Sequence, residues 1–160
     1  MRLVLDASAA VRLVLRGEQS ARLLAALDQA AVVTAPGLFV AEVANALWKY
    51  HRNGNLSLDD AVVRYEEAMA LVDQVTPDGE IVTEAIAEAC RRNHPVYDLL
   101  YAVLARRQGA AVLVFIELRA PGYPGSTYRL IHDPQSDELK GIYHQAARRQ
   151  NFEVVCFGGK

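Results

Sequence analysis

Three acidic residues in the first hundred positions stand where their side chains could act together. Asp6 directly follows the apolar run 3–5 and is followed only by small residues, and Asp98 comes shortly after Pro95. Glu42 lies on the apolar side of a segment with helical spacing, where it should be partly buried. A buried carboxylate is costly unless it is paired or bound to a cation. Three such positions favour a metal cluster, although Asp6 and Asp98 would also serve as helix N-caps.

The chemistry of this acid set indicates a hard cation. Carboxylates without nearby histidine or cysteine favour Mg²⁺ or Mn²⁺ over Zn²⁺. Such an ion lowers the pKa of a bound water, and two of them clamp the attacking and leaving oxygens of a phosphodiester. The residues therefore predict hydrolytic phosphoryl transfer with water as the nucleophile.

Short apolar runs alternate with segments of helical spacing, and this alternation predicts the fold. It is typical of an α/β protein with a central parallel sheet, here of about five strands, and helices on both faces. Ligands bind such sheets at the carboxyl ends of the strands, where Asp6 stands. We predict strands at 3–5, 31–36, within 71–78, at 111–116 and at 152–157. We predict helices at 8–15, 20–30, 38–54, 57–71, 78–92, 98–109 and 133–146.

Length and composition limit the class of protein. A chain of 160 residues is expected to form one domain, and 52% hydrophobic with 22% charged residues is typical of a globular protein. The net charge of −2 gives no overall attraction to nucleic acid. Cys90 and Cys156 lie far apart, so we expect two buried thiols in a reducing cytoplasm. We expect no signal peptide and no membrane span.

The order of three stretches resembles PIN-domain ribonucleases, and most of all the VapC-type toxins of bacterial toxin–antitoxin pairs. The stretches are LVLDASAA, FVAEVANALWK and YDLLYAVLARRQGAAVLV, and the resemblance covers about residues 1–117. It implies a single PIN-like domain over 1–160 in which Asp6, Glu42 and Asp98 correspond to site acids. Ser8 stands where the family often has a hydroxyl near the metal. Asn45, one turn after Glu42, could face the site.

The fourth acid of the family departs from its usual pattern. The family follows the strand at 111–114 with Thr or Ser, any residue and Asp, whereas this chain has Phe115, Ile116 and Glu117. Strand continuity favours Glu117, but helix continuity favours Asp133 in LIHDPQSDEL. A third interpretation gives neither acid a role, with Asp133 a plain N-cap and 115–160 a divergent segment. We assign Asp6, Glu42, Asp98 and Glu117 as catalytic, and Asp6, Asp98 and Glu117 as metal ligands.

The resemblance therefore predicts an endoribonuclease toxin that depends on Mg²⁺ or Mn²⁺ and uses a metal-activated water. Its expected partners are RNA, a cognate antitoxin protein and a second copy of the chain. Eight basic residues on the predicted helices could meet RNA phosphates, or could simply be solvated. They are Arg12, Arg16, Lys49, Arg52, Arg91, Arg92, Arg106 and Arg107.

Other function classes fit less well. A catalytically weakened PIN-like module that binds antitoxin or RNA is the main alternative, and the segment 115–133 would distinguish it. Phosphatases with an aspartyl nucleophile need a second aspartate two positions after the first, where this chain has Ser8. A phospho-receiver needs a lysine after a late strand, and none follows 111–116.

Overall fold

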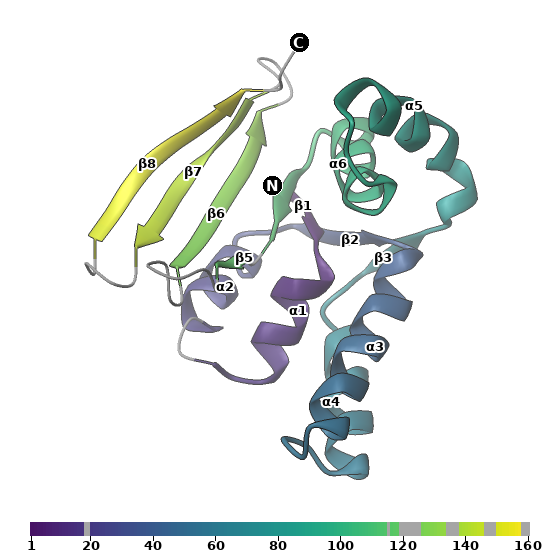
Figure 1. The fold of residues 1–160 in the computed structure, drawn as a ribbon, viewed down its shortest axis with the longest axis vertical. Helices are drawn as coiled ribbons and strands as arrows, with labels where there is room; N and C mark the ends of the chain where they lie inside the picture. Colours follow the sequence, from purple (N-terminus) through teal and green to yellow (C-terminus); the bar gives the residue numbers. More distant parts are fainter. Residues whose placement is uncertain (18–19, 115, 119–125, 134–137, 146–149, 158–160) are drawn as a thin grey trace.

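A computed structural model gives the fold. It describes the backbone of residues 1–17, 20–114, 116–118, 126–133, 138–145 and 150–157, and side chains within 1–114 apart from 18, 19 and 22. Four strands form a parallel sheet in the order β3-β2-β1-β4 (Figure 1). They are β1 (Arg2–Leu5), β2 (Val32–Pro36), β3 (Gln74–Thr76) and β4 (Ala111–Leu113). The predicted parallel α/β sheet is confirmed, with four strands in place of five.

Helices cover both faces of this sheet, as predicted. Figure 1 shows α5 and α6 on one side and α1, α3 and α4 on the other. The helices are α1 (Ala7–Val14), α2 (Ser20–Leu27), α3 (Leu38–Arg52), α4 (Leu58–Met69), α5 (Val82–Arg92) and α6 (Val96–Gln108), with a 3-10 turn η1 (Asp78–Glu80) before α5. None of them is long and apolar enough to cross a membrane. Their inward faces bury the core of the domain, whose largest members include Leu5, Phe39, Leu47, Ile81 and Leu104.

Local sequence chemistry sets several helix ends. Ser57 caps α4 by accepting a hydrogen bond from the Asp60 amide at 3.0 Å. Gly109 ends α6 in the left-handed region, at φ +58°, where glycine has no Cβ to strain. Helix α6 begins at Val96, with Pro95 as its N-cap residue, so Asp98 lies in its first turn instead of opening it.

The C-terminal third differs from the prediction. A second, antiparallel sheet has the order β5-β6-β7-β8, formed by β5 (Ile116–Leu118), β6 (Ser126–Asp133), β7 (Glu138–Gln145) and β8 (Gln150–Phe157). The predicted helix over 133–146 is therefore wrong, because β7 occupies most of it, and Asp133 ends a strand instead of capping a helix. The strand predicted at 152–157 exists but pairs with β7, outside the parallel sheet.

One prediction about burial is also wrong. Cys90 is exposed, on the outer side of α5, while the side chain of Cys156 lies outside the described residues. Trp48 and Tyr97 are 49% and 59% exposed although large aromatic side chains favour the core. The packing of the helices, and not the residue type, decides which aromatic side chains of α3 and α6 are buried.

Candidate metal and active site

Asp6 occupies the junction between β1 and α1. The three apolar residues before it are buried in the sheet, and its amide donates to the Leu113 carbonyl at 3.0 Å, which ties it to β4. Its carboxylate accepts hydrogen bonds from the Ser8 amide, at 2.8 Å, and from the Ser8 hydroxyl. Asp6 is thus the N-cap of α1, as one interpretation predicted, and Ser8 adjoins it as the resemblance implied.

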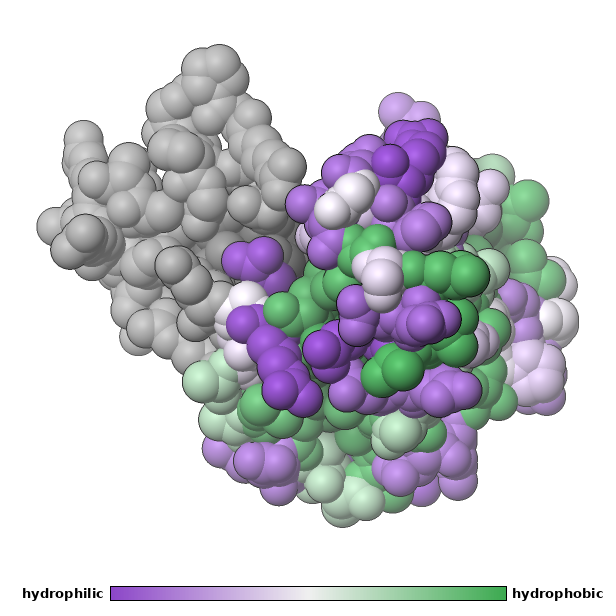
Figure 2. Space-filling model, turned by 90° about the horizontal axis from the view of Figure 1, so that it is seen from below, coloured by the Kyte–Doolittle hydropathy of each residue, from purple (hydrophilic) through white to green (hydrophobic). Residues whose placement is uncertain are grey.

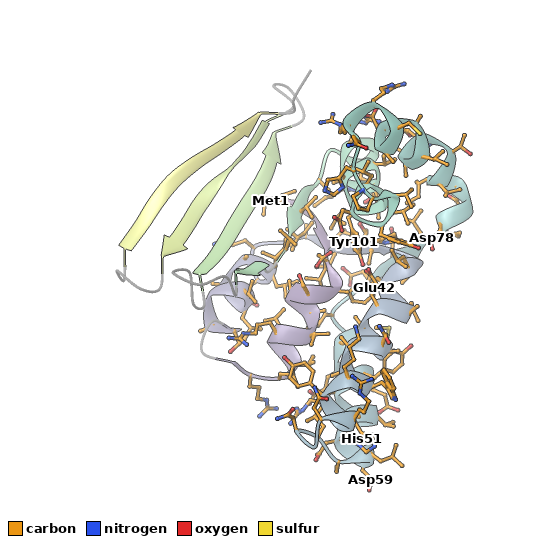
Figure 3. The ribbon with its side chains drawn as sticks, viewed as in Figure 1. Met1, Glu42, His51, Asp59, Asp78 and Tyr101 are labelled. Atoms are coloured by element: carbon orange, nitrogen blue, oxygen red, sulfur yellow. The ribbon has the colours of Figure 1, made fainter. Side chains whose placement is uncertain are left out.

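Glu42 projects from the second turn of α3, on the side of the buried residues Phe39, Val43 and Leu47. It is half-buried, as predicted from its place on the apolar side of the helix. The Tyr101 hydroxyl donates to Glu42 Oε2 at 2.6 Å, across from α6 (Figure 3). Tyr101 is only 3% exposed, so a rigid core residue fixes the direction of this carboxylate.

Asp98 enters from the third element, in the first turn of α6. Its side chain is 71% exposed, and His94 Nε2 lies 3.6 Å from its Oδ2. An acid in the first turn interacts favourably with the helix macrodipole. The capping role predicted for Asp98 is therefore replaced by a first-turn position that leaves its carboxylate open to solvent.

The pKa values of Asp6 and Glu42 are raised, in part by the charges of neighbouring acids. Burial raises the pKa of Asp6, the Ser8 hydrogen bonds lower it, and the charge of Asp98 raises it further. Burial also raises the pKa of Glu42, the Tyr101 hydrogen bond opposes this, and Asp6, Asp98 and Asp78 add repulsion. Like charges that face one another favour binding of a cation, which removes the repulsion.

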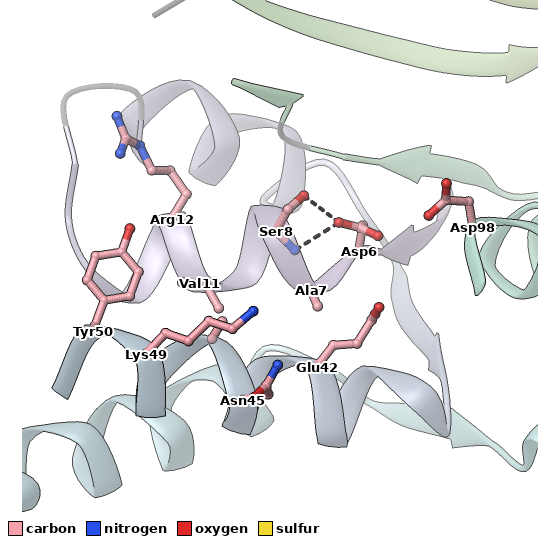
Figure 4. A pocket seen from close by; sticks show the side chains of 11 residues that line it. Asp6, Ala7, Ser8, Val11, Arg12, Glu42, Asn45, Lys49, Tyr50 and Asp98 are labelled. Atoms are coloured by element: carbon pink, nitrogen blue, oxygen red, sulfur yellow. Dashed lines mark hydrogen bonds between the residues drawn. The ribbon is translucent and has the colours of Figure 1, made fainter. Parts of the chain in front are cut away.

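One cleft of about 450 Å³ joins the three acids (Figure 4). The acids lie at one end of it with Ser8, while Asn45, Lys49 and Tyr50 of α3 line the rest. The expectation that Asn45 faces the site is thus met. The sheet places Asp6 at the carboxyl end of β1, and packing of α1 against α3 brings Glu42 alongside it.

The donor set of the acidic end suits a hard cation. Its described donors are carboxylate and hydroxyl oxygens, with no thiol or imidazole in the lining of the cleft. However, no three acidic, histidine or cysteine side chains among the described residues converge closely enough to hold a metal ion by themselves. The residues therefore fit Mg²⁺ or Mn²⁺ in chemistry. A further ligand, or a small movement of the acids toward one another, is needed to complete the coordination of the ion.

The two candidates for the fourth acid lie on the second sheet. Glu117 is the middle residue of β5 and pairs with Thr127, the second residue of β6. Asp133 is the last residue of β6 and pairs with Glu138. Six residues of extended chain, roughly 20 Å, separate Thr127 from Asp133. The side chains of Glu117 and Asp133 lie outside the described residues.

Most of the basic residues expected near RNA have other partners. Arg106 and Arg107 of α6 pair with Glu84 of α5, and Arg91, Arg92 and Arg106 pair with Glu88. This network joins α5 to α6, and it lowers the pKa of Glu84 and Glu88 through hydrogen bonds with arginine. All four arginines therefore have carboxylate partners on α5.

Two side chains near the site had no assigned role in the sequence. Nothing in the local pattern around Tyr101 distinguishes a phenol that reaches Glu42. Asp78 comes close to α3 at Gly37, where an added Cβ would lie 3.1 Å from Asp78 Oδ2. Its Oδ1 is buried and has no hydrogen-bond partner among the described residues. Asp78 thus adds negative charge near Glu42, and this follows from the tertiary structure and not from the local sequence.

Tyr101→Phe should destabilise the protein by roughly 1.5 kcal/mol at pH 8, since it removes a hydrogen bond to a charged group. Burial and the Glu42 contact raise the pKa of Tyr101, so the phenol is a protonated donor at this pH. The bond favours ionised Glu42, so its loss raises the pKa of Glu42. The destabilisation is therefore complete above that pKa and shrinks as Glu42 is protonated at lower pH.

Urea denaturation of wild type and Tyr101→Phe at pH 8 and pH 4 measures this difference. Tyr97→Phe, which removes an exposed hydroxyl from the same helix, is the matched control and should change stability by less than about 0.5 kcal/mol. Equal effects of the two substitutions would show that the Tyr101–Glu42 contact contributes nothing.

Comparisons with known proteins agree with this architecture. A family model described as "PIN domain" matches residues 3–115. Ribonuclease VapC3 of Pyrobaculum aerophilum is 34% identical over 126 residues, which cover 78% of this chain and 96% of the relative.

Two solved structures share the fold. PAE2754 from Pyrobaculum aerophilum superposes with a TM-score of 0.57 at 24% identity, over 71% of this chain and 74% of that one. VapC20 of Mycobacterium tuberculosis, described as a sarcin-ricin loop cleaving toxin, gives a TM-score of 0.51 at 18% identity, over 68% of this chain and 84% of that one.

Proposed function

Since this chain is a VapC-type member of the PIN-domain family, we propose that it is an endoribonuclease toxin that hydrolyses RNA phosphodiester bonds with Mg²⁺ or Mn²⁺. One observation carries the proposal: Asp6, Glu42 and Asp98, from three separate elements, face a single cleft. A purely structural role would explain the contacts of each acid separately. It would not explain why all three acids line the same cleft. We propose the cytoplasm as the place of this activity.

The acids divide into ligands and a proton acceptor in this proposal. Asp6, Asp98 and Glu117 hold the cation, which when bound supplies Lewis acidity and lowers the pKa of water. Glu42 is the catalytic base that accepts a proton from the attacking water. Its raised pKa suits this role, because a base works best when its pKa approaches the working pH. Tyr101 is a positioning residue that orients Glu42.

The backbone favours Glu117 over Asp133 as the fourth acid. Leu113 is paired with Leu5, next to Asp6, and Glu117 follows it by four residues. Four residues span at most about 14 Å, so the Glu117 backbone is kept near the site. Asp133 lies at the end of β6 opposite to the residues that pair with β5. A further ligand from β5 would also complete the site that the three described acids leave open.

Glu117→Gln should therefore weaken Mn²⁺ binding by about 10-fold or more, as loss of a ligand or of its closest support does. Asp133→Asn is the matched control and should change the affinity by less than about 2-fold. Calorimetric titration of Mn²⁺ into both variants and the wild type measures the difference. The reverse ranking would assign the fourth position to Asp133, and two unchanged affinities would give neither acid a role.

Beside RNA, a cognate antitoxin protein and a second copy of the chain are the partners that we propose. A cluster of carboxylates attracts a basic side chain of a protein inhibitor. An apolar groove of about 250 Å³ between α3 and α4, lined by Leu47, Trp48, Leu58 and Val62 among others, offers surface for protein contact. Figure 2 shows hydrophobic and hydrophilic residues side by side on the end of the molecule nearest the α3–α4 turn.

Cleavage of a labelled single-stranded RNA by the purified chain with Mn²⁺ tests the function. Metal-dependent cleavage into internal fragments supports the endoribonuclease. Binding of Mn²⁺ without cleavage of any RNA supplied would favour the second candidate, a weakened module that binds antitoxin or RNA. The departure from the family pattern at Phe115 and Glu117 is the observation that favours this candidate.

A further inference from the structure

The cleft continues beyond the acids along α3. Glu42, Asn45 and Lys49 follow one another at spacings of three and four, which places them on one face of the helix. All three line the cleft, together with Tyr50 at its far end. Figure 4 shows the Lys49 side chain lying along the cleft with its ammonium group directed toward the acidic end. The cleft therefore has an acidic end and a basic, aromatic end.

Lys49 has no ion-pair partner among the described residues, whereas several arginines elsewhere in the domain have one. Arg64, Arg91, Arg92, Arg106 and Arg107 all contact carboxylates within 4.0 Å. Arg52, one turn after Trp48 on α3, stacks over that indole ring, 4.8 Å from its centre. Arg52 already supplies a cation to the C-terminal end of the α3 dipole. Neither an ion pair nor the helix dipole therefore explains why the Lys49 side chain is directed into the cleft.

Arg12 also borders the cleft but is directed elsewhere. Figure 4 shows its guanidinium group turned away from the acids. It packs over Gly17, where an added Cβ would lie 2.7 Å from Arg12 Nε. Of the two basic side chains that line the described cleft, Lys49 is therefore the one directed toward the acids.

An acidic centre needs such a cation to accept a polyanion. Carboxylates repel the phosphates of an RNA strand, and only the phosphate at the metal has that repulsion removed. Seven residues of α3, about 10 Å, separate Glu42 from Lys49. Tyr50 offers an aromatic side chain on which an unpaired base can stack, and Asn45 offers an amide between the two.

We infer that Lys49, with Asn45 and Tyr50, forms a subsite for the nucleotide next to the cleaved bond, in which Lys49 binds its phosphate. This inference rests on the proposed ribonuclease function. The subsite takes single-stranded RNA, because a stacked base must leave its duplex partner. Lys49 is a binding residue of this subsite and takes no part in the proton transfers.

Lys49→Gln, Lys49→Arg and Arg52→Gln test the subsite, the last being a matched loss of charge on the same helix. Binding of a fluorescent single-stranded RNA of mixed sequence is followed by anisotropy in EDTA, with RNA integrity checked on gels. We expect Lys49→Gln to weaken binding about 3- to 10-fold at 50 mM salt. We also expect it to lower the slope of log Kd against log salt by about 0.7, the value for one phosphate of a single strand.

Lys49→Arg should restore binding, and Arg52→Gln should retain it. In cleavage assays with Mn²⁺, Lys49→Gln should raise KM with kcat within about 2-fold of wild type, as loss of uniform binding does. Equal effects of Lys49→Gln and Arg52→Gln would overturn the subsite. So would an unchanged salt slope.

A second measurement uses RNA in which one phosphate at a time is replaced by an uncharged methylphosphonate. Wild type should lose affinity at one position next to the cleaved bond, where Lys49→Gln loses none. Failure of the two proposals can be told apart. Lys49-dependent binding without cleavage overturns the nuclease alone, whereas cleavage that ignores Lys49 overturns the subsite alone.

Discussion

Asp6→Asn should reduce RNA cleavage at least about 100-fold while the protein stays folded. Loss of a residue that merely supports a metal ligand costs 10- to 100-fold in affinity or activity, and loss of a ligand itself should exceed that. Asparagine keeps the oxygen that accepts from the Ser8 amide and is as good an N-cap as aspartate. The substitution thus removes the charge and leaves the start of α1 intact. It also removes the Asp6 charge, which adds to the effect of burial in raising the pKa of Glu42.

The measurement is single-turnover cleavage of a labelled RNA, with circular dichroism and thermal melting on the same samples. Asp59→Asn, an exposed acid in the first turn of α4, is the matched control and should cleave like wild type. Asp6→Ala separates charge from capping, because it should also destabilise the protein by about 1 kcal/mol. Cleavage retained by Asp6→Asn would return Asp6 to the role of a helix cap alone.

Removal of divalent cations should abolish cleavage to the level of a buffer control, and Mn²⁺ or Mg²⁺ should restore it. The lining of the acidic end offers carboxylate and hydroxyl oxygens, which bind hard cations weakly enough for a chelator to remove them. Without the cation, two carboxylates with raised pKa repel both each other and the phosphate of the substrate. Both attraction of the substrate and activation of water are then lost.

EDTA treatment, dialysis and stepwise return of Mn²⁺ measure this dependence, with calorimetric titration of Mn²⁺ on the same sample. Zn²⁺ is an informative second ion, since it prefers nitrogen and sulfur ligands that the described cleft does not offer. Cleavage that persists in excess EDTA would rule out metal catalysis. Mn²⁺ binding that restores no cleavage would instead support the binding module.

The acidic end of the cleft was largely predictable from the sequence. The apolar run before Asp6 predicts a buried strand, and the carboxyl ends of parallel strands collect functional side chains. Glu42 interrupts an apolar helical face, which predicts a partly buried acid. These are local patterns, and the PIN-domain resemblance depends on the same stretches. The three acids come from β1, α3 and α6, and a parallel sheet brings these elements together. The alternation of strands and helices in the sequence already implies such a sheet.

The C-terminal third was not predictable in the same way. The segment 138–145 has apolar residues at spacings that suit a helix, yet it forms β7, whose backbone hydrogen bonds run to β6 and β8. Strand pairing joins residues far apart in the chain, and such tertiary pairing overrides local propensity. The same reason moves 152–157 out of the parallel sheet.

By itself, then, the sequence determined the α/β class, the parallel sheet and the three acids that face the cleft, because strand ends and helix faces follow from local periodicity. Only the tertiary structure decided which charges remain available. Arg106 and Arg107 resemble Lys49 in sequence, but packing of α5 against α6 pairs them with Glu84 and Glu88. Lys49 faces the cleft because α3 packs against α1. Whether a side chain meets a partner depends on neighbours that are distant in the chain.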